Sequence, residues 1–262
     1  MSTANTTKIN QLLSSQPLGV VFQSFWLTKQ GYSLDLQKRY RKGHWLESIG
    51  RGAMIRSADQ VSYEGAIYAL QEQNSMSVHP GGRTALSILG KSHYLTLSEK
   101  VVTIFGMSDE KLPAWLLSHN WGVVINYHQS SFLPPEIGMS VIEVKNFSLK
   151  VSGAARALME CLYLAPEKME LIECYELMEG LNNLKPTQVQ YLLEQCNSIK
   201  VKRLFLYMAE KANHNWMKFL NLEKVDLGQG KRSLVKGGVY VEKYQITIPK
   251  ELEDYGKHIK SV

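Results

Sequence analysis

Cationic and amide side chains recur between residues 37 and 51 in a pattern suited to contacting a polyanion. Lys38, Lys42 and Arg51 carry charged nitrogens of the kind that pair with phosphate oxygens. Gln37, together with the arginines that follow it, can form paired hydrogen bonds with the edges of adenine and guanine. The sequence therefore predicts one surface that combines phosphate contacts with base discrimination.

Motifs of the common enzyme classes are missing from the sequence. It contains no Walker loop and no GxGxxG, GxSxG or HExxH motif, and its seven histidines lack metal-ligand spacing. We therefore expect no catalytic residue, no metal and no cofactor. One alternative stays open. Glu143 and Lys145 in a β-prone run, with Glu136 upstream, have the form of Mg-dependent nucleases, in which a strand places an acid and a lysine beside a metal.

The elements that must position the cationic residues follow a helix-turn-helix pattern. A helix is expected over residues 24–30, and Gly31 then closes it in the left-handed conformation. Ser33 is a good N-cap for the next helix, over residues 34–42, and Asp35 in its first turn complements the helix dipole. The second helix of such a pair is the one that enters the major groove of DNA.

The helix over residues 34–42 separates its apolar and basic side chains. At about 100° per residue, Leu36 and Tyr40 lie on one arc of the helix. Lys38, Arg41 and Lys42 lie on the opposite arc. The helix is therefore expected to bury one side and to present the other to a ligand.

A short hairpin is expected directly after this helix. Gly43 ends the helix, and residues 45–49 and 53–56 form two strands around Gly50-Arg51-Gly52. Glycines at the tip permit positive φ and let the backbone come close to DNA. Arg51 between them is placed to meet phosphate or to enter a minor groove. This hairpin is the wing of a winged helix-turn-helix.

Positive charge is concentrated at the start of the chain. The first 60 residues hold eight Lys and Arg against three Asp and Glu, in a chain of 262 residues with a net charge of +6. We expect a winged helix-turn-helix DNA-binding domain over residues 1–60 and a second domain over residues 61–262. Winged helices also serve as protein-docking modules, which is a further alternative. Cations on both the helix and the wing favour a polyanion.

The remainder of the chain mixes helices and strands in clusters. This pattern favours an α+β fold, in which the winged helix-turn-helix precedes a larger mixed α/β C-terminal domain, over a regular βαβ alternation. The expected elements are helices over 6–15, over 61–73 and in four pieces between 152 and 213, and strands over 101–105, within 122–150 and near 233–235 and 239–248.

Two further groups of basic residues lie in the second domain. They permit a second nucleic-acid surface, although interspersed acids make a solvated charged face the simpler interpretation. The groups are Lys200, Lys202 and Arg203, and Lys231, Arg232 and Lys236.

Cysteine usage and hydropathy indicate the compartment. The three cysteines lack CxxC spacing, so neither a zinc site nor a disulfide framework is indicated, which fits a reducing cytosol. No apolar run approaches the roughly 20 residues that span a bilayer, and the polar start MSTANTTK lacks a signal-peptide core. We expect a soluble cytoplasmic protein with no membrane partner.

Four phrases occur in order within the first 120 residues: GYSLDLQKRYRKGHWLESIGRGAMIR, VSYEGAIYALQEQ, VHPGGRTALSILGKSHYL and KLPAWL. Together they resemble the AbiEi family of antitoxins from bacterial abortive-infection, type IV toxin–antitoxin systems. The composition of the remainder is compatible with the C-terminal domain of that family, although its motifs there are weaker.

The resemblance implies a transcriptional autorepressor that is also an antitoxin. Its winged helix-turn-helix would bind double-stranded DNA at inverted repeats upstream of its own operon. Its C-terminal domain would neutralise a nucleotidyltransferase-like toxin without forming a stable complex with it. The residues that correspond to the DNA-binding helix and wing of the family are Ser33, Gln37, Lys38, Arg39, Tyr40, Arg41, Lys42, Arg51 and Arg56.

Overall fold

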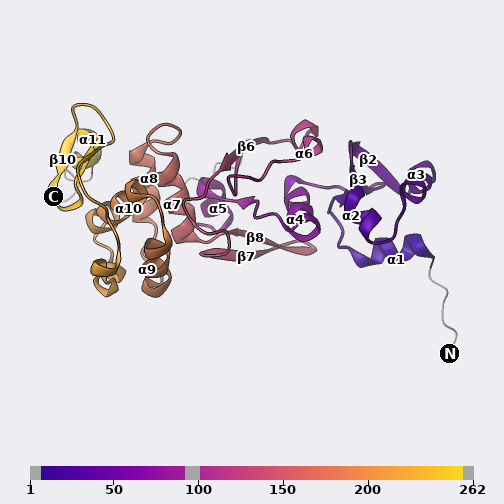
Figure 1. The fold of residues 1–262 in the computed structure, drawn as a ribbon, viewed down its shortest axis with the longest axis horizontal. Coiled ribbons are helices and arrows are strands. Elements are labelled where there is room, and N and C mark those ends of the chain that lie inside the picture. The colour runs from indigo at the N-terminus through magenta and orange to yellow at the C-terminus, as the bar shows by residue number, and fades with distance from the viewer. Residues whose placement is uncertain (1–6, 92–100, 256–262) are drawn as a thin grey trace. The chain divides into compact units, whose positions relative to one another are not determined.

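A computed structural model of the chain describes residues 7–91 and 101–255 (Figure 1). The described residues have the α+β composition that the sequence predicts. The chain forms two compact units. Unit 1 comprises Met1–His79, Glu99–Gln129 and Val141–Val151, and unit 2 comprises Pro80–Ser98, Ser130–Ser140 and Ser152–Val262. Each unit is therefore assembled from separate stretches of sequence, and a functional boundary at residue 60 stays a prediction.

Unit 1 begins with a winged helix-turn-helix. Gly31, at φ +83°, turns the chain between its second and third helices, and the Ser33 hydroxyl caps the third helix by accepting from the Leu36 N–H at 3.3 Å. The strands form an antiparallel sheet in the order β1-β3-β2. The elements are α1 (Lys8–Ser15), β1 (Phe22–Gln23), α2 (Ser24–Lys29), α3 (Leu34–Lys42), β2 (Leu46–Gly50) and β3 (Ala53–Arg56).

This winged helix has its own hydrophobic core. Side chains from all three helices and all three strands meet in it, which matches the apolar faces expected from the sequence. The buried members are Leu12, Phe22, Leu27, Tyr32, Tyr40, Leu46 and Met54.

The remaining strands of unit 1 form a three-stranded sheet in the order β4-β5-β6 and a two-stranded sheet of β7 and β8, and β4, β7 and β8 each have an end in unit 2. Strands β5 and β6 are parallel and are connected through α6, and β7 pairs with β8. Helix α4 is tied to β1 by a buried amide, because the Gln73 side chain accepts from the Gln23 N–H at 2.9 Å and donates to the Val21 carbonyl at 2.7 Å. The elements are α4 (Tyr63–Asn74), β4 (His79–Pro80), β5 (Val101–Gly106), α6 (Ala114–Ser118), β6 (Val124–Gln129), β7 (Met139–Val144) and β8 (Phe147–Ser152).

Unit 2 is mainly helical. The four helices expected between residues 152 and 213 are present, and α7 and α10 supply much of its buried core. A three-stranded sheet in the order β10-β11-β9 belongs to the same unit. The elements are α5 (Gly82–Ile88), α7 (Ala154–Leu164), α8 (Leu171–Glu179), α9 (Pro186–Gln195), α10 (Ile199–Lys211), α11 (Lys250–Asp254), β9 (Arg232–Ser233), β10 (Val239–Val241), β11 (Ile246–Ile248) and the 3-10 helices Asn215–Phe219, Leu222–Lys224 and Glu242–Tyr244.

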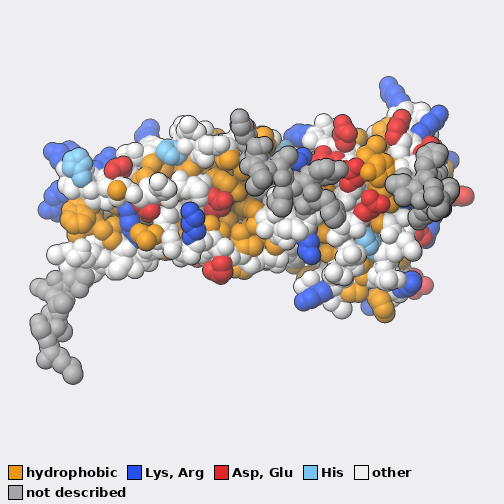
Figure 2. Space-filling view, turned by 180° about the vertical axis from the view of Figure 1, so that it is seen from behind, with side chains coloured by type: hydrophobic (Ala, Val, Ile, Leu, Met, Phe, Trp, Pro, Cys, Tyr) orange, Lys and Arg blue, Asp and Glu red, His pale blue; other side chains and the backbone are white. Residues whose placement is uncertain are grey.

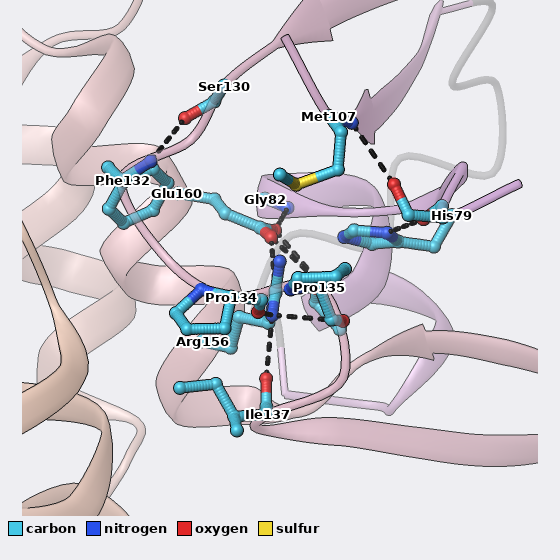
Figure 3. A network of polar contacts seen from close by, with 12 residues as sticks. His79, Gly82, Met107, Ser130, Phe132, Pro134, Pro135, Ile137, Arg156 and Glu160 are labelled. Carbon is cyan, nitrogen blue, oxygen red and sulfur yellow. Dashed lines mark hydrogen bonds and ion pairs between the residues drawn. The ribbon is translucent and has the colours of Figure 1, made fainter. Parts of the chain in front are cut away.

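A buried ion pair joins three segments of unit 2 (Figure 3). The Glu160 carboxylate, with 0% exposure, accepts hydrogen bonds from the Gly82 N–H at 2.8 Å and from the Ser152 hydroxyl. It also accepts from Arg156 Nε at 2.9 Å, and the Arg156 guanidinium donates to the backbone carbonyls of Pro134, Pro135 and Ile137 in the loop before β7. Because both charges have several partners, the pair fixes α7 to the start of α5 and to that loop.

Every helix within residues 7–91 and 101–255 is too short or too polar to cross a membrane.

Candidate nucleic-acid interface

Helix α3 presents a cationic face to solvent. Lys38, Arg39, Arg41 and Lys42 are all exposed, as the helical spacing predicts. The N-cap residue of the same helix, Ser33, is also exposed. Figure 2 shows Lys and Arg side chains gathered at the α3 end of unit 1, at the left of that view.

Gln37 does not belong to this face. Its side chain is 2% exposed and lies between α2 and α3. The amide nitrogen lies 2.8 Å from the Tyr32 carbonyl and 3.1 Å from both the Ser24 carbonyl and the Thr28 hydroxyl. The amide oxygen accepts from the Ser24 hydroxyl at 2.6 Å. The expected base contact is therefore corrected: Gln37 is turned inward because its polar atoms are satisfied within the module.

Tyr40 is also turned inward. It is 8% exposed and belongs to the core of the winged helix, where its ring lies 6.5 Å from that of Tyr32. Burial, followed by the neighbouring Tyr32, raises the pKa of Tyr40. The DNA contact expected of Tyr40 is replaced by a packing role, in agreement with its place on the apolar arc of the helix.

Arg56 holds the module together from within. It is 8% exposed, and its guanidinium donates to the carbonyl oxygens of Leu13, Gln16 and Pro17. These acceptors lie in the last turn of α1 and in the two residues that follow the helix, so Arg56 fixes the end of α1 to β3. Burial lowers the pKa of Arg56, and nearby Asp59 opposes this shift. The expected DNA contact of Arg56 is wrong, because the side chain is buried and both terminal nitrogens of its guanidinium, Nη1 and Nη2, donate to the backbone.

Arg51 occupies the tip of the wing, as the sequence predicts. It is exposed between Gly50 and Gly52, whose φ angles are +155° and +87°. The Ser24 N–H donates to the Gly52 carbonyl at 2.8 Å, which ties the tip to the start of α2. The hairpin therefore presents one guanidinium beside the recognition helix.

The cations that stay exposed have no internal counter-ion. Among residues 7–91 and 101–255, no acidic side chain forms an ion pair with any of them. A surface cation without an ion-pair partner breaks no salt bridge when it contacts a phosphate. The contact also releases a counterion from the nucleic acid, which favours binding. The exposed set is Lys38, Arg39, Arg41, Lys42 and Arg51.

Trp45 is a further candidate for contact with nucleic acid, although its sequence position predicted only a strand. It is 48% exposed and follows His44, which is exposed at φ +53° directly after the basic end of α3. Its indole N–H has no acceptor within the described parts of the chain. An aromatic residue that directly follows a basic helix end is the sequence signal that identifies it.

The two basic groups of unit 2 differ from each other. Lys202 and Arg203 are 3% and 1% exposed, and Arg203 donates to four backbone carbonyls, including that of Leu227 at 2.7 Å. Lys200 donates to two carbonyls at the end of α7. Lys200 and Arg203 therefore tie segments of the unit together, and Lys202 is buried, so this group forms neither a nucleic-acid surface nor a solvated charged face. Lys231, Arg232 and Lys236 are exposed.

The residues of the nuclease alternative do not share a strand face. Glu143 lies in β7 and accepts from the Ser148 hydroxyl at 2.7 Å, but Lys145 lies in the turn after that strand at φ +47°. Glu136 belongs to unit 2, whereas Glu143 belongs to unit 1. Within the described residues, no group of three or more His, Cys, Asp or Glu is arranged to hold a metal.

Two family models match the chain. Residues 5–97 match one described as transcriptional regulator, AbiEi antitoxin N-terminal domain, and residues 99–249 match one described as transcriptional regulator, AbiEi antitoxin, Type IV TA system. No curated protein matches the chain by sequence.

A crystal structure of the RV2827C protein from Mycobacterium tuberculosis superposes on the chain with a TM-score of 0.54 at 14% identity. The superposition covers 91% of this chain and 88% of that chain. At this identity the likeness concerns the fold alone.

Proposed function

The chain belongs to the AbiEi antitoxin family of transcriptional regulators in type IV toxin–antitoxin systems, and we propose that it is a sequence-specific DNA-binding autorepressor without catalytic activity. Residues 1–60 bind an inverted-repeat operator in the cytoplasm. The remainder of the chain, residues 61–262, serves the antitoxin function.

The observation that carries this proposal is the unpaired cationic set on α3 and the wing. Lys38, Lys42 and Arg51 contact phosphates and supply most of the affinity. Arg39 or Arg41 reads a base in the major groove, which discriminates by about 1–3 kcal/mol for each good contact. The N-cap at Ser33 is exposed, which supports a contact between the positive end of α3 and the backbone of the duplex.

The test compares two full-length variants with the same change in net charge. Ala at Arg39, Arg41 and Arg51 removes three cations from the proposed surface, and Ala at Lys231, Arg232 and Lys236 removes three exposed cations from unit 2. The first variant should bind a duplex from upstream of its own reading frame about 100-fold more weakly at moderate salt, with a shallower salt dependence. The second should bind as the wild type does. Equal losses in both, or undiminished binding by the first, would contradict the proposal.

The toxin partner of the proposed antitoxin is nucleotidyltransferase-like. Neutralisation occurs without a stable complex, so the two proteins should elute separately in size-exclusion chromatography. The Arg39, Arg41 and Arg51 variant should still protect cells that express such a toxin from the neighbouring reading frame, although it no longer represses the operon. Loss of protection together with repression would show that the two functions are not divided between the two parts of the chain.

A further inference from the structure

The wing strand β2 lies directly against helix α6. Gly50, the last residue of β2, packs so closely on Trp115 that a Cβ built on Gly50 would lie 2.9 Å from Trp115 Cβ and 3.2 Å from its Cα. Real Cβ atoms essentially never come within 3.0 Å of a carbon atom in this way, and the φ of +155° also favours glycine at this position. Glycine is therefore required where the wing meets α6, which lies more than 50 positions later in the chain.

The α6 side of this contact is held in place by aromatic packing. Trp115 is 4% exposed, and its ring lies 6.4 Å from the ring of Trp121 at an interplanar angle of 70°. The Trp121 indole N–H donates to the Leu116 carbonyl at 2.7 Å, and His119 packs edge-on against Trp121 at 4.4 Å. Because these contacts join α6 to the residues that follow it, the segment is held in a fixed position next to the wing.

The pairing of the two wing strands is irregular next to Gly50. The register between β2 and β3 shifts between Ser48 and Gly50, so the ladder is irregular just before the tip. On the β3 side, the tip is held by the bond from the Ser24 N–H to the Gly52 carbonyl. On the β2 side, the contact at Gly50 is with Trp115. Arg51 therefore lies between two anchors, one of which belongs to α6.

We propose that Trp115 is a positioning residue for the wing: its ring, packed against Trp121, holds α6 in place, so that the Cα and Cβ of Trp115 support Gly50 and set the direction of Arg51 toward the phosphate backbone of DNA. The working DNA-binding unit then extends beyond residue 60 to include α6, in agreement with the assignment of Glu99–Gln129 to the same compact unit as the winged helix. This inference rests on the proposed DNA-binding function.

A double-mutant cycle in the full chain tests the inference. Wild type, Arg51→Ala, Trp115→Ala and the double variant are titrated with the same upstream duplex over a series of salt concentrations. If Trp115 acts through Arg51, each single variant weakens binding about fivefold, and the double variant is no weaker than Arg51→Ala alone. Trp115→Ala also lowers the salt slope by about one phosphate contact, although tryptophan carries no charge.

A merely structural role for Trp115 predicts different results. General destabilisation would multiply with the effect of Arg51→Ala and would leave the salt slope unchanged, and either result would overturn the inference. Trp115→Phe, which keeps an aromatic ring to pack against Trp121, should restore most of the affinity. If Trp115→Ala fails to fold, Gly50→Ala takes its place in the cycle, because the added methyl separates β2 from α6.

The outcomes also separate this inference from the proposed function. Wild-type protein that shows no salt-dependent binding would contradict the DNA-binding function itself. Wild-type binding that is unaffected by Arg51→Ala would contradict only the role of the wing and of Trp115, because the cations of α3 would then supply the affinity.

Discussion

Replacing Gln37 with leucine tests whether this side chain reads DNA or holds the helix-turn-helix together. The two side chains have similar volumes, so the substitution removes hydrogen bonds without opening a large cavity. An amide NH₂ group has two hydrogens, so at most two of the three contacts of the Gln37 nitrogen form at once. With the bond accepted from Ser24, three hydrogen bonds are lost.

The expected cost follows from this count. At roughly 1 kcal/mol of net stability for each hydrogen bond, Gln37→Leu should lower the free energy of unfolding by about 3 kcal/mol. The loss has this size because the Ser24 hydroxyl and the Tyr32 carbonyl lose a buried partner. Urea unfolding of the full-length protein, followed by tryptophan fluorescence, measures it.

DNA binding by the same variant provides the second measurement. Because Gln37 is 2% exposed, Gln37→Leu should leave the preference of the protein for its operator over single-base-pair variants unchanged within about twofold. The matched control is Lys38→Ala, the exposed neighbour, which should change stability by less than about 0.5 kcal/mol while weakening binding to all sequences alike. Wild-type stability of Gln37→Leu with relaxed preference at one base pair would refute the buried placement.

Three further predictions concern other parts of the protein. Glu160→Gln should lower the free energy of unfolding by about 3–5 kcal/mol because it leaves a buried guanidinium without its counter-ion. Glu173→Gln, in an ion pair whose side chains are 40% and 34% exposed, should cost less than about 1 kcal/mol, and similar losses in urea unfolding would contradict this. Burial, together with nearby carboxylates, raises the pKa of Tyr127 to about 12, so the unfolding free energy should fall as the pH rises from about 10, where unfolded tyrosine ionises. Tyr127→Phe should reduce that fall, and an unchanged pH dependence would disprove the assignment. Burial raises the pKa of Cys174 to about 12, so iodoacetamide near pH 8 should label this thiol only in urea; mass spectrometry that finds rapid labelling of the native protein would contradict its burial.

Local features of the winged helix could be predicted from the sequence because neighbouring residues determine them. Gly31 adopts positive φ at the turn, and Ser33 caps α3 through the residue three positions later. The hairpin around Arg51 follows from its flanking glycines. The exposed cations of α3 follow from a period of about 3.6 residues, which needs no knowledge of the partner surface.

The direction of polar side chains near the edge of a helix face could not be predicted in the same way. Gln37 adjoins the basic arc of α3, so its sequence position is compatible with either side. Its inward direction is decided by acceptors on α2 and on the turn. Arg56 is similar, since it is buried by carbonyls that lie about 40 positions earlier in the chain. Arg203 is buried by carbonyls at Leu227 and beyond.

The sequence by itself determined the helices, the turns, the wing and the concentration of charge in the first 60 residues, because these depend on short-range periodicity and on backbone preferences of single residues. Only the tertiary structure decided which cations are exposed to a ligand and which are buried and donate hydrogen bonds within the protein. It also decided that α6 packs against the wing through Gly50 and Trp115. The physical reason is that burying a polar group is favourable only where partners exist, and those partners come from segments brought together by the folding of the whole unit.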